Sequence, residues 1–147
     1  MQTMQAKPSN RVITLGGIWA SKVSLEVVMN VSLLEYGKAL IALEKALCEP
    51  KSDIVRDATI QRFEFCVELA WKSAKKQMGT ATSAPKSVVR EMAQNSLIDD
   101  VDFWLRSIDQ RNLSSHTYRE DLAEMVYQFA REFLAKGQDL LLRLQKI

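Results

Sequence analysis

Apolar residues that recur alternately three and four positions apart, from about residue 24 to the C-terminus, constrain the fold most. An α-helix has about 3.6 residues per turn, so this spacing gathers them on one face of each helix. The stripes contain Leu33, Tyr36, Leu40, Leu43 and Leu47; Ile60, Phe63, Val67, Ala70, Ala74 and Met78; Val88, Val89, Met92 and Ala93; and Leu122, Val126, Phe129, Phe133, Leu140 and Leu144. Helices with such faces must pack against one another. We therefore predict an all-α, up-and-down bundle of four or five helices.

Turn and capping residues separate the stripes. Pro50 interrupts the first stripe because proline disfavours helix in the residue before it. Ser52 or Asp53 can cap the following helix by accepting from its free amides, and Gly79 is suited to end it. Pro85 fits the first turn of a short third helix, where its missing N–H costs nothing.

Two further helix starts are predicted near the C-terminal half. Asp99 is a candidate N-cap, with Ile98 and Phe103 placed as a hydrophobic staple. Thr117, followed three residues later by Glu120, has the pattern of a capping box that opens the last helix. The Ser114-Ser115 pair between them breaks the preceding helix.

Composition sets limits on the class of protein. The 147 residues fit one domain, and 47% apolar with 26% charged residues is typical of a globular chain. The formal net charge is only +2 and the basic residues are scattered, which does not indicate wholesale coating of nucleic acid but is compatible with a small RNA-cleaving site. Cys48 and Cys66 are isolated and only one histidine is present, so we expect no metal and no cofactor, with the thiols packing as small apolar groups.

The first residues are harder to assign. Lys7 and Arg11 precede the apolar run 12–20, which faintly resembles a signal peptide but is short and interrupted by two glycines. No run approaches the roughly 20 apolar residues that span a bilayer. We therefore assign residues 1–23 to an N-terminal extension and residues 24–147 to the bundle, and expect a cytoplasmic protein without membrane contact.

The helix predicted to begin near Asp99 has a further apolar stripe, and this stripe leads to a charged residue. Val101, Trp104 and Ile108 continue in the same step to Arg111, which places a guanidinium on a packing face. Burying an unpaired charge is costly, so Arg111 requires a partner. Arg111 closes one helix and His116 lies just before the next, and we expect both to project into the same corner between helices.

This corner contains the chemistry needed to cleave RNA without a metal. Histidine can give and take protons near neutral pH, and arginine offers a fixed positive fork for phosphate. Asn112 can orient either neighbour. On spacing alone, an alternative stays open: His116 is a loop residue that bonds a helix end, and Arg111 pairs with a nearby carboxylate.

The segment Arg111-Asn112, three spacers, His116, one spacer, Tyr118 resembles the signature of HEPN domains. Further stretches, over residue 30 to the C-terminus, resemble one branch of these domains, the nucleotidyltransferase substrate-binding proteins. They are Arg62-Phe63-Glu64-Phe65, Glu68-Leu69-Ala70-Trp71-Lys72, Pro85-Lys86 with Arg90-Glu91, and Leu97-Ile98-Asp99-Asp100 with Trp104. Ser96 stands where this branch has glycine. By residue spacing, Phe63, Phe65 and Trp71 are interpreted as core residues, and Glu68 with Lys72 as an i,i+4 ion pair.

The resemblance implies a homodimer with the two Arg–His corners facing each other, and a companion minimal nucleotidyltransferase. In toxin–antitoxin members it implies that Arg111 and His116 are catalytic residues of a metal-independent endoribonuclease. It also implies that the companion silences the toxin by AMPylation of Tyr118. The alternative is a non-catalytic module that presents substrate to the nucleotidyltransferase or regulates it.

Overall fold

The computed structural model describes the backbone of residues 17–147 and the side chains of residues 32–147. This part of the chain contains five α-helices, one 3₁₀ turn and no strand, which confirms the predicted all-α class. The elements are α1 (Gly17–Cys48), α2 (Asp53–Met78), α3 (Pro85–Gln94), α4 (Val101–Leu113), η1 (Ser114–His116) and α5 (Glu120–Gln145). Residues 17–23 of the predicted extension are thus the first turns of α1, and residues 1–16 lie outside the described residues.

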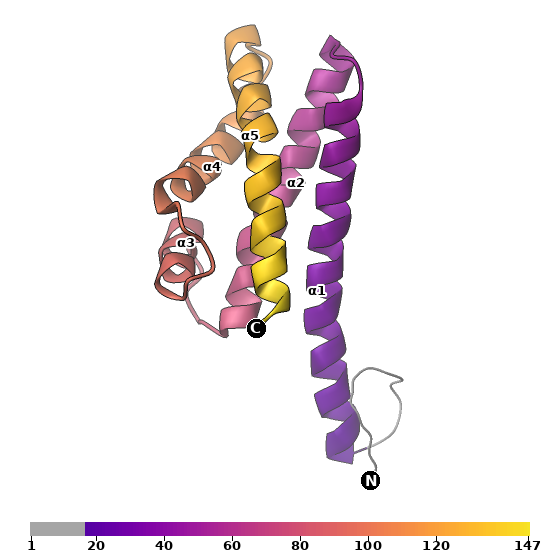
Figure 1. Ribbon diagram of the computed structural model, residues 1–147, viewed down its shortest axis with the longest axis vertical. Helices are drawn as coiled ribbons and strands as arrows, with labels where there is room; N and C mark the ends of the chain where they lie inside the picture. The colour runs from indigo at the N-terminus through magenta and orange to yellow at the C-terminus, as the bar shows by residue number, and fades with distance from the viewer. Residues whose placement is uncertain (1–16) are drawn as a thin grey trace.

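The helices form two groups, one of three long helices and one of two shorter helices. The long helices α1, α2 and α5 run side by side, while α3 and α4 cover the side of α2 and α5 away from α1 (Figure 1). None of the helices from residue 17 onward combines the length and the apolar content needed to cross a membrane.

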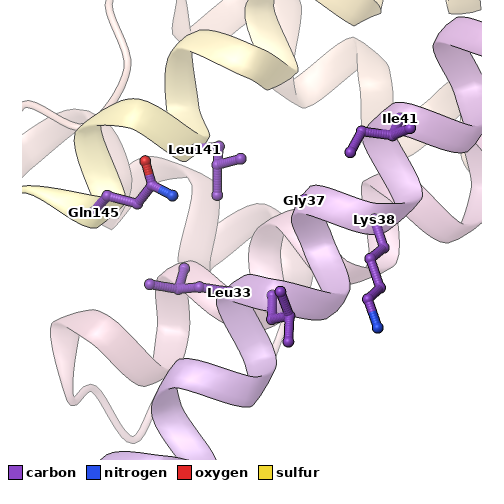
Figure 2. A pocket seen from close by; sticks show the side chains of 7 residues that line it. Leu33, Gly37, Lys38, Ile41, Leu141 and Gln145 are labelled. Carbon is purple, nitrogen blue, oxygen red and sulfur yellow. The ribbon is translucent and has the colours of Figure 1, made fainter. Parts of the chain in front are cut away.

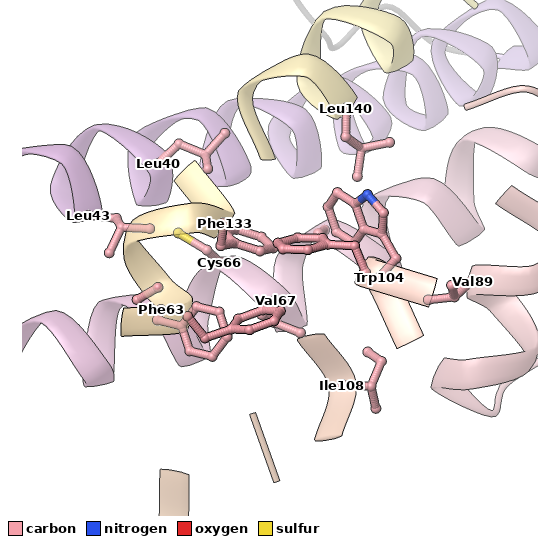
Figure 3. Close-up of a cluster of buried hydrophobic side chains, with 14 of the residues drawn as sticks. Leu40, Leu43, Phe63, Cys66, Val67, Val89, Trp104, Ile108, Phe133 and Leu140 are labelled. Carbon is pink, nitrogen blue, oxygen red and sulfur yellow. The ribbon is translucent and has the colours of Figure 1, made fainter. Parts of the chain in front are cut away.

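Aromatic side chains from three helices fill the centre of the bundle. The Phe133 ring of α5 lies edge-on to Phe63 of α2, with centroids 5.4 Å apart, and to Trp104 of α4, at 5.3 Å. Phe103 and Phe129 stack at 4.7 Å. Figure 3 shows leucines of α1 and α5 closing this cluster. Such pairs add about 0.5–1.5 kcal/mol each beyond the burial of their area, so the cluster holds α2, α4 and α5 in a fixed register.

Both ends of α2 follow the sequence prediction. Ser52 Oγ accepts from the Val55 amide over 3.1 Å and is the N-cap. Gly79 ends the helix at φ 67°, in the left-handed region that costs glycine little. Pro85 begins α3, as predicted, after an N-cap at Ala84 that lacks a capping side chain.

The two other capping predictions are wrong. The cap of α4 is Asp100, which accepts from the Phe103 amide over 3.0 Å, because Asp99 instead binds Arg143 of α5 through both guanidinium Nη atoms. Thr117 does not cap α5: its hydroxyl donates to the Ser114 carbonyl within the 3₁₀ turn, and the N-cap position falls at Arg119.

Two residues predicted to be buried are exposed. Phe63 is fully buried, but Phe65 is 54% exposed. Two residues turn a helix by about 200°, so both rings of α2 cannot face one core. Cys66 packs in the core as predicted, whereas Cys48 is exposed because α1 ends there.

Candidate functional site

The segment that joins α4 to α5 is a tight turn built from hydroxyl side chains. Ser115 Oγ donates to the Asn112 carbonyl over 3.1 Å, and Thr117 Oγ1 to the Ser114 carbonyl over 3.2 Å. The Ser114 hydroxyl lies 2.5 Å from the Arg111 carbonyl. Each hydroxyl thus reaches a carbonyl three residues earlier, at or just after the end of α4. The chain therefore tightens into η1 and turns His116 away from the core.

Arg111 lies in the last turn of α4 and faces α2. Its Nε donates to Glu68 Oε2 over 2.9 Å, and its Nη1 lies 3.5 Å from Glu64 Oε2. The Arg111 side chain is 31% exposed. The packing-face arginine thus has the partner that its position requires, and the partner is a pair of glutamates one turn apart, which we call the Glu64–Glu68 clamp.

Further contacts join the clamp to the η1 turn and to the next turn of α2. The Ser114 hydroxyl, which has one proton to donate, is also within hydrogen-bonding distance of Glu64 Oε2. The Trp71 indole N–H points at Glu68 Oε2 over 3.4 Å, and Lys72 Nζ lies 3.5 Å from Glu68 Oε1, which confirms the predicted i,i+4 pair. One network therefore connects the η1 turn, Arg111 and the middle of α2.

Opposing effects determine the charge state of Glu68. Partial burial by itself raises the pKa of the Glu68 carboxyl. Hydrogen bonds from Arg111 and Trp71, together with the charges of Arg111 and Lys72, outweigh burial and lower that pKa below its ordinary value of 4.5. Glu68 is therefore an anion at neutral pH and a permanent counter-charge to Arg111.

His116, the last residue of η1, and Tyr118 form an exposed pair of rings. Their rings meet edge to face with centroids 6.1 Å apart, and Tyr118 is 80% exposed. His116 is also exposed. Both the imidazole and the phenol hydroxyl are open to another molecule.

The turn gathers the four predicted site residues in one short stretch but does not bond them to one another. Within residues 32–147, neither Asn112 nor His116 makes a side-chain hydrogen bond to Arg111. Asn112 is exposed, and its role in orienting a neighbour stays a prediction. Sequence reasoning did not assign Glu64 and Glu68 to Arg111; the signal was their i,i+4 spacing on one face of α2.

One groove in the surface adjoins the candidate site, and another lies away from it. One groove between α1 and α2 is lined by Lys38, Phe65 and Glu68, so it adjoins the clamp. A second lies between α1 and α5 and is lined by Leu33, Leu34, Gly37, Lys38, Ile41, Leu141 and Gln145 (Figure 2), none of them from the segment 111–118. Across the described residues, no group of three or more His, Cys, Asp or Glu side chains is placed to hold a metal ion.

The profile of the family described as "Nucleotidyltransferase substrate binding protein like" matches residues 31–146. The chain belongs to this family. Among curated relatives, it is similar to a protein of Haemophilus influenzae named "Probable ribonuclease HepT", with 32% identity over 102 residues, 64% of this chain and 70% of the relative.

Two solved structures share the helical bundle of this chain. A crystal structure of a protein from Thermus thermophilus matches 74% of this chain and 98% of its own, with a TM-score of 0.70 and 33% identity. HI0074 of Haemophilus influenzae matches 82% of this chain and 98% of its own, with a TM-score of 0.59 and 27% identity. Its structure is described as revealing the fold of a substrate-binding domain of a nucleotidyltransferase.

The matched range places the whole candidate site within the family's domain. Residues 31–146 include Arg111, His116 and Tyr118 together with the Glu64–Glu68 clamp. The first 30 residues, which contain the predicted extension, lie outside the match.

Proposed function

We propose that this chain is the HEPN-type partner of a minimal nucleotidyltransferase and acts as a metal-independent endoribonuclease through Arg111 and His116. The observation that carries the proposal is the exposed His116 imidazole, which lies on the tight turn that follows α4, the helix that carries Arg111 in its last turn. The relative named as a probable ribonuclease supports it. With cellular RNA as its substrate, the protein would act in the cytoplasm.

The reaction we propose is transfer within the RNA chain. The ribose 2′-oxygen attacks the adjacent phosphorus, a new O–P bond forms, and the bond to the 5′-oxygen of the next nucleotide breaks. One proton leaves the 2′-hydroxyl and one reaches the departing 5′-oxygen. Arg111 stabilises the negative charge that builds on the phosphorane-like transition state.

A single His116 cannot accept and donate both protons in one concerted step. Two copies of the chain with facing Arg–His corners provide two imidazoles, one as the base and one as the acid. The proposed chemistry thus gives a physical reason for the homodimer that the family resemblance implies.

Tyr118 is the proposed acceptor of AMP from the nucleotidyltransferase. Its phenol oxygen attacks the α-phosphorus of ATP, an O–P bond forms, pyrophosphate leaves, and the phenol proton passes to solvent or to a base of the partner. The 80% exposure of Tyr118 leaves room for the partner's active site. A bulky anion beside His116 then repels RNA phosphate and blocks access to the turn.

Two substitutions test both parts of the proposal. Expression of the wild type should arrest growth and the purified protein should cleave RNA without added metal, while His116→Ala should do neither. Tyr118→Phe should still arrest growth and cleave RNA, but co-expression with the nucleotidyltransferase should neither add an adenylyl mass nor relieve the arrest. Equal growth of wild type and His116→Ala, with no cleavage by either protein, would refute the endoribonuclease.

The second candidate is a non-catalytic subunit that binds substrate for the nucleotidyltransferase or regulates it. The Glu64–Glu68 clamp favours it, because two carboxylates beside Arg111 weaken the attraction of that guanidinium for a phosphate. In this case the transfer activity of the partner depends on the chain, His116→Ala has no effect on growth, and the purified protein leaves RNA intact.

A further inference from the structure

We infer that Glu68, assisted by Glu64, is a positioning residue that sets the orientation of the Arg111 guanidinium toward phosphate. The inference rests on the proposed endoribonuclease and adds residues of α2 to a site otherwise confined to the segment 111–118. It is carried by the hydrogen bonds of the clamp rather than by any likeness to other proteins.

The clamp engages two of the three guanidinium nitrogens. Nε is bound by Glu68 at 2.9 Å, and one N–H of Nη1 points toward Glu64 at 3.5 Å. Within residues 32–147, no acceptor bonds Nη2. The side chain is 31% exposed. The fork therefore keeps Nη2 free for a phosphate, and the clamp determines the direction in which its N–H groups point.

The clamp is itself held from both ends. Glu68 also accepts from the Trp71 indole, and the Ser114 hydroxyl of the η1 turn lies within hydrogen-bonding distance of Glu64. Since His116 belongs to the same short turn, Glu64 links the position of the imidazole to that of the guanidinium. An arginine on a helix end would otherwise sample several rotamers, and misplacing a catalytic group by about 1 Å can cost on the order of 100-fold in rate.

The same carboxylates oppose the binding of RNA. They lie beside Arg111 and repel the phosphate that Arg111 attracts. Removing the charge of Glu68 should therefore tighten the binding of RNA while making cleavage slower. A residue with a purely structural role would not separate these two effects.

The test compares Glu68→Ala and Glu68→Gln with the wild type in RNA cleavage by the purified protein. For Glu68→Ala, kcat should fall on the order of 10- to 100-fold while KM stays the same or decreases. Glu68→Gln keeps an oxygen that can accept from Nε, so its kcat should lie between the two. Glu132→Gln is the matched control: it removes the same charge from an exposed position of α5 that forms no ion pair within the described residues, and it should leave kcat unchanged.

An NMR readout is independent of activity. The Arg111 Nε–H signal, assigned by its loss in Arg111→Lys, should exchange slowly with water in the wild type and in Glu68→Gln and quickly in Glu68→Ala. A signal unaffected by Glu68→Ala, a kcat that rises, or a kcat that falls equally for both variants with an unchanged signal would overturn the positioning role.

The two proposals can fail separately. If the wild type does not cleave RNA, the endoribonuclease is refuted, and the clamp is then a structural ion pair. If the wild type cleaves RNA and Glu68→Ala cleaves it equally well, only the positioning role is refuted.

Discussion

Replacing Gly137 by alanine should destabilise the bundle at a tight contact between α1 and α5. A Cβ at this position would lie 2.8 Å from Phe133 Cε2 and 2.9 Å from Leu40 Cδ2. It would also lie 3.2 Å from the Tyr36 hydroxyl, which donates to the Gly137 carbonyl over 2.8 Å. All three neighbours are buried, so the new methyl group has no free space.

The Phe133 ring cannot easily move aside. It is fully buried and lies edge-on between Phe63 at 5.4 Å and Trp104 at 5.3 Å. Overpacking of this kind costs roughly 1–3 kcal/mol. Alanine is better than glycine inside a helix by about 1 kcal/mol, which offsets part of the cost. We therefore expect Gly137→Ala to lower the free energy of unfolding by about 1 kcal/mol.

Gly37 provides a matched control on the facing helix. A Cβ there would meet only Leu141 Cδ2, at an ordinary 3.5 Å. Gly37→Ala should therefore raise the free energy of unfolding by roughly 0.5–1 kcal/mol through helix propensity alone. The difference between the two variants isolates the overpacking cost.

Urea unfolding followed by circular dichroism measures both variants at one temperature and protein concentration. Each kcal/mol should also appear as a shift in Tm of about 2–4 °C. If Gly137→Ala is as stable as Gly37→Ala within error, the packing argument for α1 and α5 is refuted.

Three further predictions concern single side chains. Ser52→Ala should cost about 1 kcal/mol of unfolding free energy in urea titrations, because it removes the N-cap of α2. Under native conditions a thiol reagent should label exposed Cys48 and leave Cys66 intact by mass spectrometry, since burial raises the pKa of the Cys66 thiol to about 12; equal labelling would contradict this. Because folding lowers the pKa of Glu68, its ionised carboxylate stabilises the folded state. This contribution to the free energy of unfolding is complete above the ordinary pKa of 4.5 and is lost as pH falls further. The stability deficit of Glu68→Gln should therefore shrink below about pH 4.5 in urea titrations across pH.

Much of the fold can be predicted from local patterns. The three-four spacing predicts the helices, and the buried side chains Tyr36, Leu40, Phe63 and Phe133 all lie on the predicted stripes. The cap at Ser52 is predictable as well, whereas Thr117 is not a cap because its hydroxyl bonds within the local turn. A helix start fails to follow the pattern where a distant residue competes: Arg143 of α5 engages Asp99, and the cap moves to Asp100.

The candidate site likewise combines features that the sequence predicts with features that depend on helix packing. The sequence places Arg111, His116 and Tyr118 around one helix junction, and the geometry of η1 depends on the hydroxyls within it. The exposure of Phe65 and the bonding of Arg111 to α2 rather than to His116 depend on how α2 and α4 pack, which residue spacing does not specify.

What the sequence determines by itself is that the chain is helical, which face of each helix is apolar, and that a charge on one of those faces needs a partner. The identity of that partner is decided by the tertiary structure, which brings Glu68 and Glu64 to Arg111 across 43 and 47 residues of chain. The reason is physical: helix periodicity depends on neighbouring residues, whereas the choice of facing helix and its register depends on how side chains from distant segments pack together.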